Sequence, residues 1–136
     1  MKRKVPVVPC SGIGKSLGAA AREAAYIVSE DLRPDDAKVA ALGLLILGDE
    51  EARREVSGRP AIAIDGCKLE CAAKGLKSAG ASVVRKVAVF DIVRRLRGLK
   101  PEGICDLNAD GITLARASAD EAARIADEII AEDDRA

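Results

Sequence analysis

The chain has 136 residues, 49% of them hydrophobic, which suits one domain with a single core. Basic and acidic residues number 22 each, and the rings are one Phe and one Tyr, so we expect no nucleic-acid binding. No apolar run approaches the ~20 residues that span a bilayer, and the apolar part of the N-terminal stretch is too short for a signal peptide. We therefore expect a cytoplasmic protein with no membrane partner.

The chain contains four cysteines and no histidine. In a cytoplasmic protein, cysteines are more often metal ligands or redox thiols than structural disulfides. The absence of histidine excludes the commonest general base, the Ser-His and Cys-His nucleophile pairs and mixed Cys/His zinc sites. A zinc site in this chain would therefore consist mostly of sulfur ligands.

The first quarter of the chain predicts a strand, a glycine-rich loop and a helix. Residues 5–9 form a short β-branched run, and two glycines follow in the loop 10–16. Apolar residues at helical spacing then predict a helix over 15–30. We expect it to end before Pro34, because proline cannot continue a helix.

The next apolar run covers residues 39–47 and is interrupted by Gly43. Its continuous hydrophobicity predicts a second strand with an irregular exit, although a buried helix would have a similar composition. The acidic residues at 49–51 then predict the start of a short helix.

The stretch 60–74 predicts a strand, a tight turn and a helix. Residues 61–64 have the length and β-branched content of a buried parallel strand, and Gly66 supplies the turn. We expect the helix to begin near Cys67, which would place Cys67 and Cys71 one turn apart on one face. The positive end of the helix would favour thiolates there.

A helix stop near Gly80, a strand over 82–87 and an amphipathic helix over 89–96 continue the alternation of strands and helices. This alternation predicts a three-layer α/β fold over residues 1–136, with a small four-stranded parallel sheet flanked by helices. We adopt 2-1-3-4 as the possible strand order.

The C-terminal part of the chain predicts an irregular segment followed by one helix. Residues 99–117 are polar, lack a regular pattern and contain Cys105. Ser118 and Glu121 match a capping box, which predicts a C-terminal helix over 118–133.

The assumed strand order brings three cysteines together. Ligands of such sheets bind beyond the carboxyl ends of the strands, where the strand order reverses. Cys10 follows the first strand and Cys67 the third, so both would lie at that point, with Cys71 close by. Two or three neighbouring sulfurs hold a soft metal, exchange disulfides or are inert core residues, and the spacing alone leaves these options open.

The loop after the first strand is a candidate ligand-binding segment formed by Ser11, Gly12, Gly14 and Lys15. It matches a nucleotide-binding P-loop only in part, because proline replaces the first glycine. The loop is similar to that of phosphotransferase-system IIB domains, in which a phosphate is carried on a cysteine, here Cys10. Such a phosphocysteine carrier is one alternative function. A thiol redox protein is another, although thioredoxin-type chemistry uses C-x-x-C rather than C-x-x-x-C.

Three motifs together resemble the DGC-domain family of proposed zinc-binding proteins. They are Pro-Cys-Ser-Gly-x-Gly-Lys at 9–15, Arg-Glu-Ala-Ala-Tyr at 22–26 and Ile-Asp-Gly-Cys-x-x-x-Cys-Ala at 64–72. The resemblance covers roughly residues 5–95. It implies a small cytoplasmic prokaryotic domain with cysteine ligands and no established reaction.

The resemblance implies a metal site, for which Zn²⁺ is favoured over an iron-sulfur cluster. The candidate ligands are Cys10, Cys67, Cys71 and Cys105. Cys105 is included as a possible replacement ligand, because the family pattern has a further cysteine near Ala40 and this chain has none there. The partner is an unknown small molecule or protein, and whether the protein is an enzyme stays open.

Overall fold

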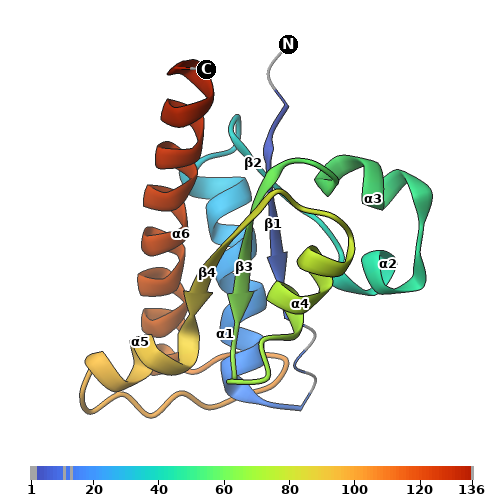
Figure 1. Ribbon diagram of the computed structural model, residues 1–136. Helices are drawn as coiled ribbons and strands as arrows, with labels where there is room; N and C mark the ends of the chain where they lie inside the picture. The colour runs from blue at the N-terminus through green and yellow to red at the C-terminus, as the bar shows by residue number, and fades with distance from the viewer. Residues whose placement is uncertain (1–2, 11, 13, 136) are drawn as a thin grey trace.

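The computed structural model describes residues 3–10, 12 and 14–135. Its centre is a four-stranded sheet in which every neighbouring pair is parallel, in the order β2-β1-β3-β4. The predicted strand order 2-1-3-4 is therefore confirmed. The strands are β1 (Val5–Pro9), β2 (Ala37–Val39), β3 (Pro60–Asp65) and β4 (Val83–Ala88), as Figure 1 shows.

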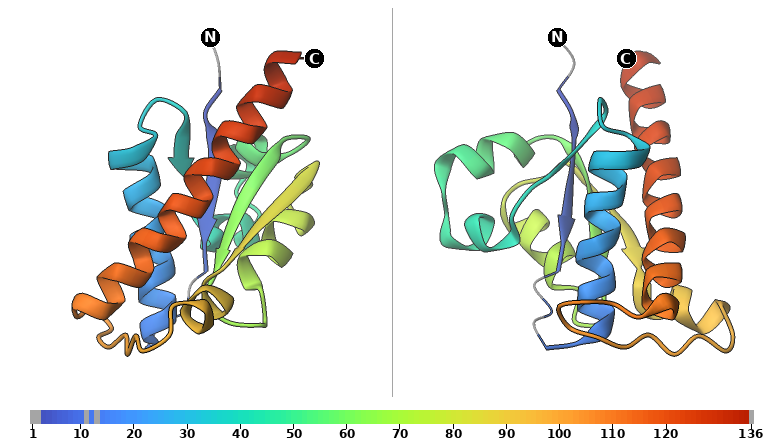
Figure 2. Two further views of the ribbon diagram at one scale, coloured as in Figure 1. Left: turned by 90° about the vertical axis from the view of Figure 1, so that its left-hand side faces the viewer. Right: turned by 180° about the vertical axis from the view of Figure 1, so that it is seen from behind.

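Helices cover both faces of the sheet, which gives the predicted three-layer α/β arrangement (Figures 1 and 2). One side carries α1 (Ser16–Tyr26), the π-helix η1 (Ile27–Leu32) that continues it, α5 (Val89–Arg95) and α6 (Ala109–Arg135). The other side carries α2 (Leu42–Leu47), α3 (Glu50–Val56) and α4 (Cys71–Ser78). None of the helices in the described ranges is both long enough and apolar enough to cross a bilayer.

The core is formed by the two central strands and the helices on either side. Apart from the terminal prolines Pro9 and Pro60, the residues of β1 and β3 are buried on both faces of the sheet, which explains why these strands are continuous apolar runs. The helix α6 packs against α1 with small residues, which let two helices approach closely. Its buried face includes Ala115, Ala119, Ala122 and Ala126.

The predicted second strand over 39–47 is wrong for most of its length. Strand β2 ends at Val39, and the apolar run after it forms the helix α2. Leu42 and Leu45 are buried at helical spacing, and Leu42 fills the space above Gly75 of α4. The packing against α4 therefore decides between strand and helix, which the uniform hydrophobicity of the run cannot do.

The C-terminal helix begins at Ala109 rather than at residue 118, so the irregular segment is shorter than predicted. Ser118 is buried in the middle of α6, and its hydroxyl donates to the carbonyl oxygen of Leu114 at 2.9 Å. The predicted capping box is therefore wrong. Asn108 caps the helix instead, because its side-chain oxygen accepts a hydrogen bond from the amide of Gly111 at 2.8 Å.

Candidate functional site

Cys10 and Cys67 lie at the carboxyl edge of the sheet and line one pocket of about 210 Å³. Cys10 follows β1, and Cys67 follows β3, which is the neighbour of β1 in the sheet. The remaining lining residues come from the loop and first turn of α1 and from the turn after β3: Gly12, Lys15, Ser16, Leu17, Gly18 and Gly66. The structure thus brings together two of the four candidate sulfur ligands.

Cys10 is fixed at the end of β1 by hydrogen bonds to β3 and to the turn that follows it. Its amide donates to the carbonyl oxygen of Ile64 at 2.9 Å, which extends the pairing of β1 with β3 by one residue. Its side chain is only 7% exposed. The amide of Gly66 donates a hydrogen bond to the Sγ of Cys10 at 3.3 Å, and an N–H donor of this kind stabilises negative charge on sulfur.

Three glycines let the backbones around Cys10 touch. A Cβ atom on Gly66 would lie 2.8 Å from the carbonyl carbon of Leu17, and a Cβ on Gly18 would overlap the carbonyl of Gly12. The first turn of α1 therefore packs directly on the turn after β3. The sequence predicted a tight turn at Gly66 but did not single out Gly18. The position of Gly18, in the first turn of an otherwise alanine-rich helix, was the feature that could have indicated a close contact.

Cys67 and Cys71 do not share a helix face, which corrects the prediction that the helix begins near Cys67. Helix α4 begins at Cys71, and residues 66–69 form a turn in which the amide of Glu70 donates to the carbonyl of Cys67 at 3.2 Å. Glu70 has a φ of 53°, which is unfavourable for a residue with a side chain. Cys71 is exposed and is not part of the lining of the Cys10 pocket.

The start of α4 is set by Asp65, the last residue of β3. Its carboxylate accepts hydrogen bonds from the amides of Ala72 at 2.9 Å and Ala73 at 3.2 Å. The side chain is 3% exposed. Burial raises the pKa of Asp65, and the two amide hydrogen bonds oppose this rise. Asp65 therefore caps the helix from six residues away, which leaves the intervening residues to form the turn.

Cys105 lies in a different hollow, of about 550 Å³, between α1 and the segment before α6. Its neighbours in the lining include Arg22 and Tyr26 of α1, and its side chain is exposed. The structure does not bring Cys105 into the pocket of Cys10 and Cys67. Among the described residues, no three Cys, Asp or Glu side chains form a group that could hold a metal ion as it stands.

Two of the four residues predicted to bind a ligand in the loop after β1 line the Cys10 pocket. Gly12 and Lys15 line the Cys10 pocket, whereas Gly14 has a φ of 84° and is not part of the lining. Ser11 lies outside the described residues. Lys15 is the N-cap residue of α1 and its side chain makes no capping hydrogen bond.

The fold and the paired cysteines define a three-layer α/β protein with a sulfur-lined pocket at the carboxyl edge of its sheet. The family model of the DGC domain matches residues 6–107. The chain belongs to the DGC-domain family, as the motifs in its sequence predicted. Searches among curated proteins and among solved structures returned no match.

Proposed function

We propose that this protein binds one zinc ion through cysteine thiolates at the carboxyl edge of its sheet. The observation that carries the proposal is the placement of Cys10 and Cys67 on one pocket, with the amide of Gly66 donating to the sulfur of Cys10. Thiolate is a strong zinc ligand, and an N–H donor to the sulfur is a common supporting contact. Membership in the DGC-domain family fits a metal-binding role.

Two sulfurs are too few for a stable zinc site, which takes three or four protein ligands. We assign Cys71 as the third ligand, reached by a shift of the turn 67–70. Glu70 has an unfavourable positive φ in that turn. A rearrangement that removes this backbone strain would offset part of the free-energy cost of moving the turn. Asp65 holds the amides of Ala72 and Ala73 and so fixes the first turn of α4 while the turn 67–70 moves.

With three sulfur ligands, a zinc ion would retain an open position and could act as a Lewis acid toward water or a substrate oxygen. The residues around this position are the small glycines and the N-terminal turn of α1. Lys15 supplies a positive charge that offsets part of the negative charge of the thiolates.

The metal content of protein purified without chelator tests this proposal directly. We expect close to one equivalent of zinc per chain by elemental analysis. Binding should weaken as the pH falls, because protons compete with zinc for the thiolates. A chain that contains no metal, and takes none up when zinc is added to the reduced protein, would rule the proposal out.

A phosphocysteine at Cys10 is the second candidate function, favoured by the first turn of α1 that lines the same pocket. In this reaction the thiolate of Cys10 attacks the phosphorus of a phosphorylated donor. An S–P bond forms while the donor's bond to phosphorus breaks, and the donor group leaves with the electron pair. Intact-mass spectrometry of the metal-free protein after incubation with acetyl phosphate distinguishes the two candidates. Phosphorylation that disappears in Cys10→Ser would support the carrier.

A further inference from the structure

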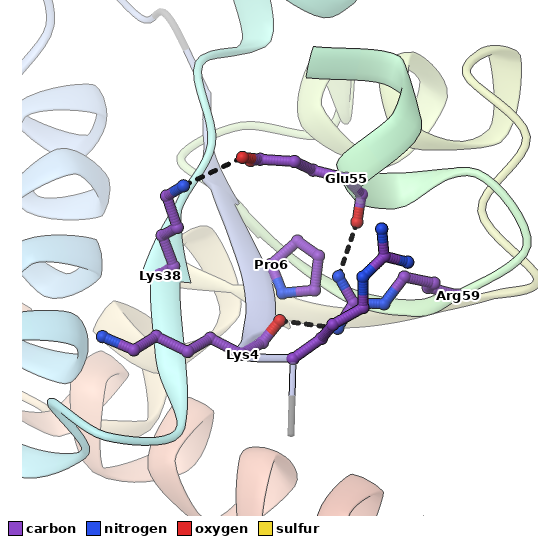
Figure 3. A pocket seen from close by; sticks show the side chains of 6 residues that line it. Lys4, Pro6, Lys38, Glu55 and Arg59 are labelled. Carbon is purple, nitrogen blue, oxygen red and sulfur yellow. Dashed lines mark hydrogen bonds and ion pairs between the residues drawn. The ribbon is translucent and has the colours of Figure 1, made fainter. Parts of the chain in front are cut away.

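A third hollow, of about 420 Å³, lies at the opposite edge of the sheet from the Cys10 pocket, near the amino ends of the strands. Its lining consists of Arg3, Lys4, Pro6, Lys38, Glu55 and Arg59. In Figure 3, the carbonyl of Lys4 faces Arg59, whereas the side chain of Lys4 runs away from Arg59 toward the strand that carries Lys38. Four of the lining side chains are cationic and only one is a carboxylate. The chain as a whole has a formal net charge of zero, so this excess of positive charge is local.

The carboxylate does not neutralise the cluster, because it is already paired. Glu55 forms an ion pair with the Nζ of Lys38 at 2.9 Å (Figure 3). In the described part of the chain, Arg3, Lys4 and Arg59 form no ion pair. Three cations therefore face or border the hollow without a carboxylate partner.

Arg59 is fixed in position by neutral acceptors. Its Nη1 donates to the carbonyl oxygen of Glu55 at 2.7 Å, and its Nη2 donates to that of Lys4 at 2.7 Å (Figure 3). The first bond also caps the last turn of α3, where a cation is favourable. Two carbonyls use only part of the N–H groups of a guanidinium, so the group is oriented and still has donors for a ligand.

The surroundings of Arg59 disfavour the positive charge of its guanidinium group. Burial and the nearby charge of Arg3 lower the pKa of Arg59, while Asp133 and Glu55 act in the opposite direction. Arg3 and Arg59 also line an adjoining hollow of about 230 Å³, together with the carboxylate of Asp133, which, among the described residues, forms no ion pair with either of them. An anion bound between the two guanidinium groups would offset both the burial and the repulsion. Capping of α3 explains one bond of Arg59, but it does not explain why Arg3 and Lys4 lie beside it.

We propose that this hollow binds a phosphate group, with Arg3 and Arg59 as its ligands and Lys4 at its rim. Guanidinium groups match the geometry of phosphate oxygens, and two of them can balance a doubly charged phosphate. The group is either free phosphate or the terminal phosphate of a small molecule such as a nucleoside diphosphate. The site is separate from the cysteine pocket, because the two lie at opposite ends of the parallel strands.

The test is a titration of the isotopically labelled full chain with inorganic phosphate and, separately, with ADP, at constant ionic strength and followed by amide NMR. We expect saturable shifts at Lys4, Lys38 and Arg59. The double variant Arg3→Gln/Lys4→Gln should weaken binding about tenfold or more, because each lost charged hydrogen bond is substantial. The control Lys74→Gln/Lys77→Gln removes the same charge from the exposed face of α4 and should leave binding unchanged.

Each outcome decides the proposal. Similar affinities for phosphate and ADP would support a site for the phosphate group alone, whereas tighter binding of ADP would support a nucleotide. Shifts that do not saturate, or an equal loss in the control variant, would reduce the effect to general charge and overturn the proposal. Shifts confined to Gly12, Lys15 and Gly66 would place the anion at the cysteine pocket and would also overturn it.

Discussion

The amide of Gly66 donates a hydrogen bond to the sulfur of Cys10 at 3.3 Å and so joins two residues that are 56 positions apart in the chain. The contact exists because β1 and β3 are neighbours in the sheet, so their following loops meet at one edge. The first turn of α1 packs on the same turn after β3, where a Cβ on Gly66 would lie 2.8 Å from the carbonyl carbon of Leu17. Fold, packing and the proposed zinc chemistry therefore depend on the same few atoms.

Single Cys→Ser variants should distinguish the cysteines that bind zinc from Cys105, which lies in another hollow. We expect Cys10→Ser and Cys67→Ser to lose zinc binding, since both side chains line the pocket. Cys71→Ser should weaken affinity by at least about tenfold, as removal of one ligand from a four-coordinate site does. Competition with a chromogenic chelator measures these affinities.

Cys105→Ser is the matched control, because this exposed cysteine lies in another hollow. Unchanged stoichiometry and affinity would agree with a three-sulfur site. Loss of zinc in this variant alone would mean that Cys105 is a ligand and that the segment before α6 moves to reach the pocket.

Substitution of the packed glycines should destabilise the fold through sterics. We expect Gly66→Ala and Gly18→Ala each to lower the free energy of unfolding by about 1–3 kcal/mol, because the new Cβ overlaps backbone atoms that cannot move aside. Urea denaturation followed by circular dichroism gives the values.

Gly43→Ala is the control for the glycine variants. Gly43 lies inside α2, and a Cβ there meets no atom within 4 Å. Alanine should stabilise this position by about 0.5–1 kcal/mol through its better helix propensity. If all three variants behaved alike, the close contact of α1 with the turn after β3 would be refuted.

Removal of the carboxylate of Asp65 should loosen the start of α4. Asp65→Ala leaves two buried amides without their acceptor, so we expect a loss of about 1–3 kcal/mol. Asp65→Asn keeps one oxygen acceptor and should cost less. Asp91→Ala, at an exposed position in α5, should change stability by less than about 0.5 kcal/mol. Hydrogen exchange at Ala72 and Ala73 measures the local effect, and unchanged protection in Asp65→Ala would contradict the capping role.

The ion pair between Arg33 and Asp127 should make stability depend on pH. The guanidinium lies 2.7 Å from the carboxylate and lowers the pKa of Asp127. A lowered folded-state pKa stabilises the fold above the unfolded pKa, and this contribution is lost as the pH falls through the folded pKa. The side chain of Asp127 is 51% exposed, so we expect only about 0.2–1 kcal/mol.

The measurement is the unfolding free energy of the wild type and of Asp127→Asn at pH 7 and pH 3. The difference between the two proteins should shrink as the pH falls from 7 to 3, because the carboxylate takes up a proton more readily in the unfolded state than in the folded state, where its pKa is lowered. Asp120→Asn, an exposed change on the same helix, provides the control for general charge effects. A difference that stays constant across this range would show that the pair contributes nothing.

The sequence by itself determined the elements whose residues carry a local signal. The buried strands and the turn glycine at 66 follow from hydrophobic runs and from glycine. The strand order 2-1-3-4 was an assumption that the rules for parallel sheets allow, and the structure confirms it. The DGC-domain family could also be recognised from the sequence, since its motifs consist of neighbouring residues.

Only the tertiary structure decided the features that depend on distant partners. The run at 42–47 is a helix because Leu42 packs on Gly75, and α6 begins early because Asn108 caps it while Ser118 is buried. Cys67 is excluded from α4 because Asp65 captures the amides of Ala72 and Ala73. In each case, a contact made across the fold overrides the local pattern, because burial and hydrogen bonding together outweigh small differences in intrinsic propensity.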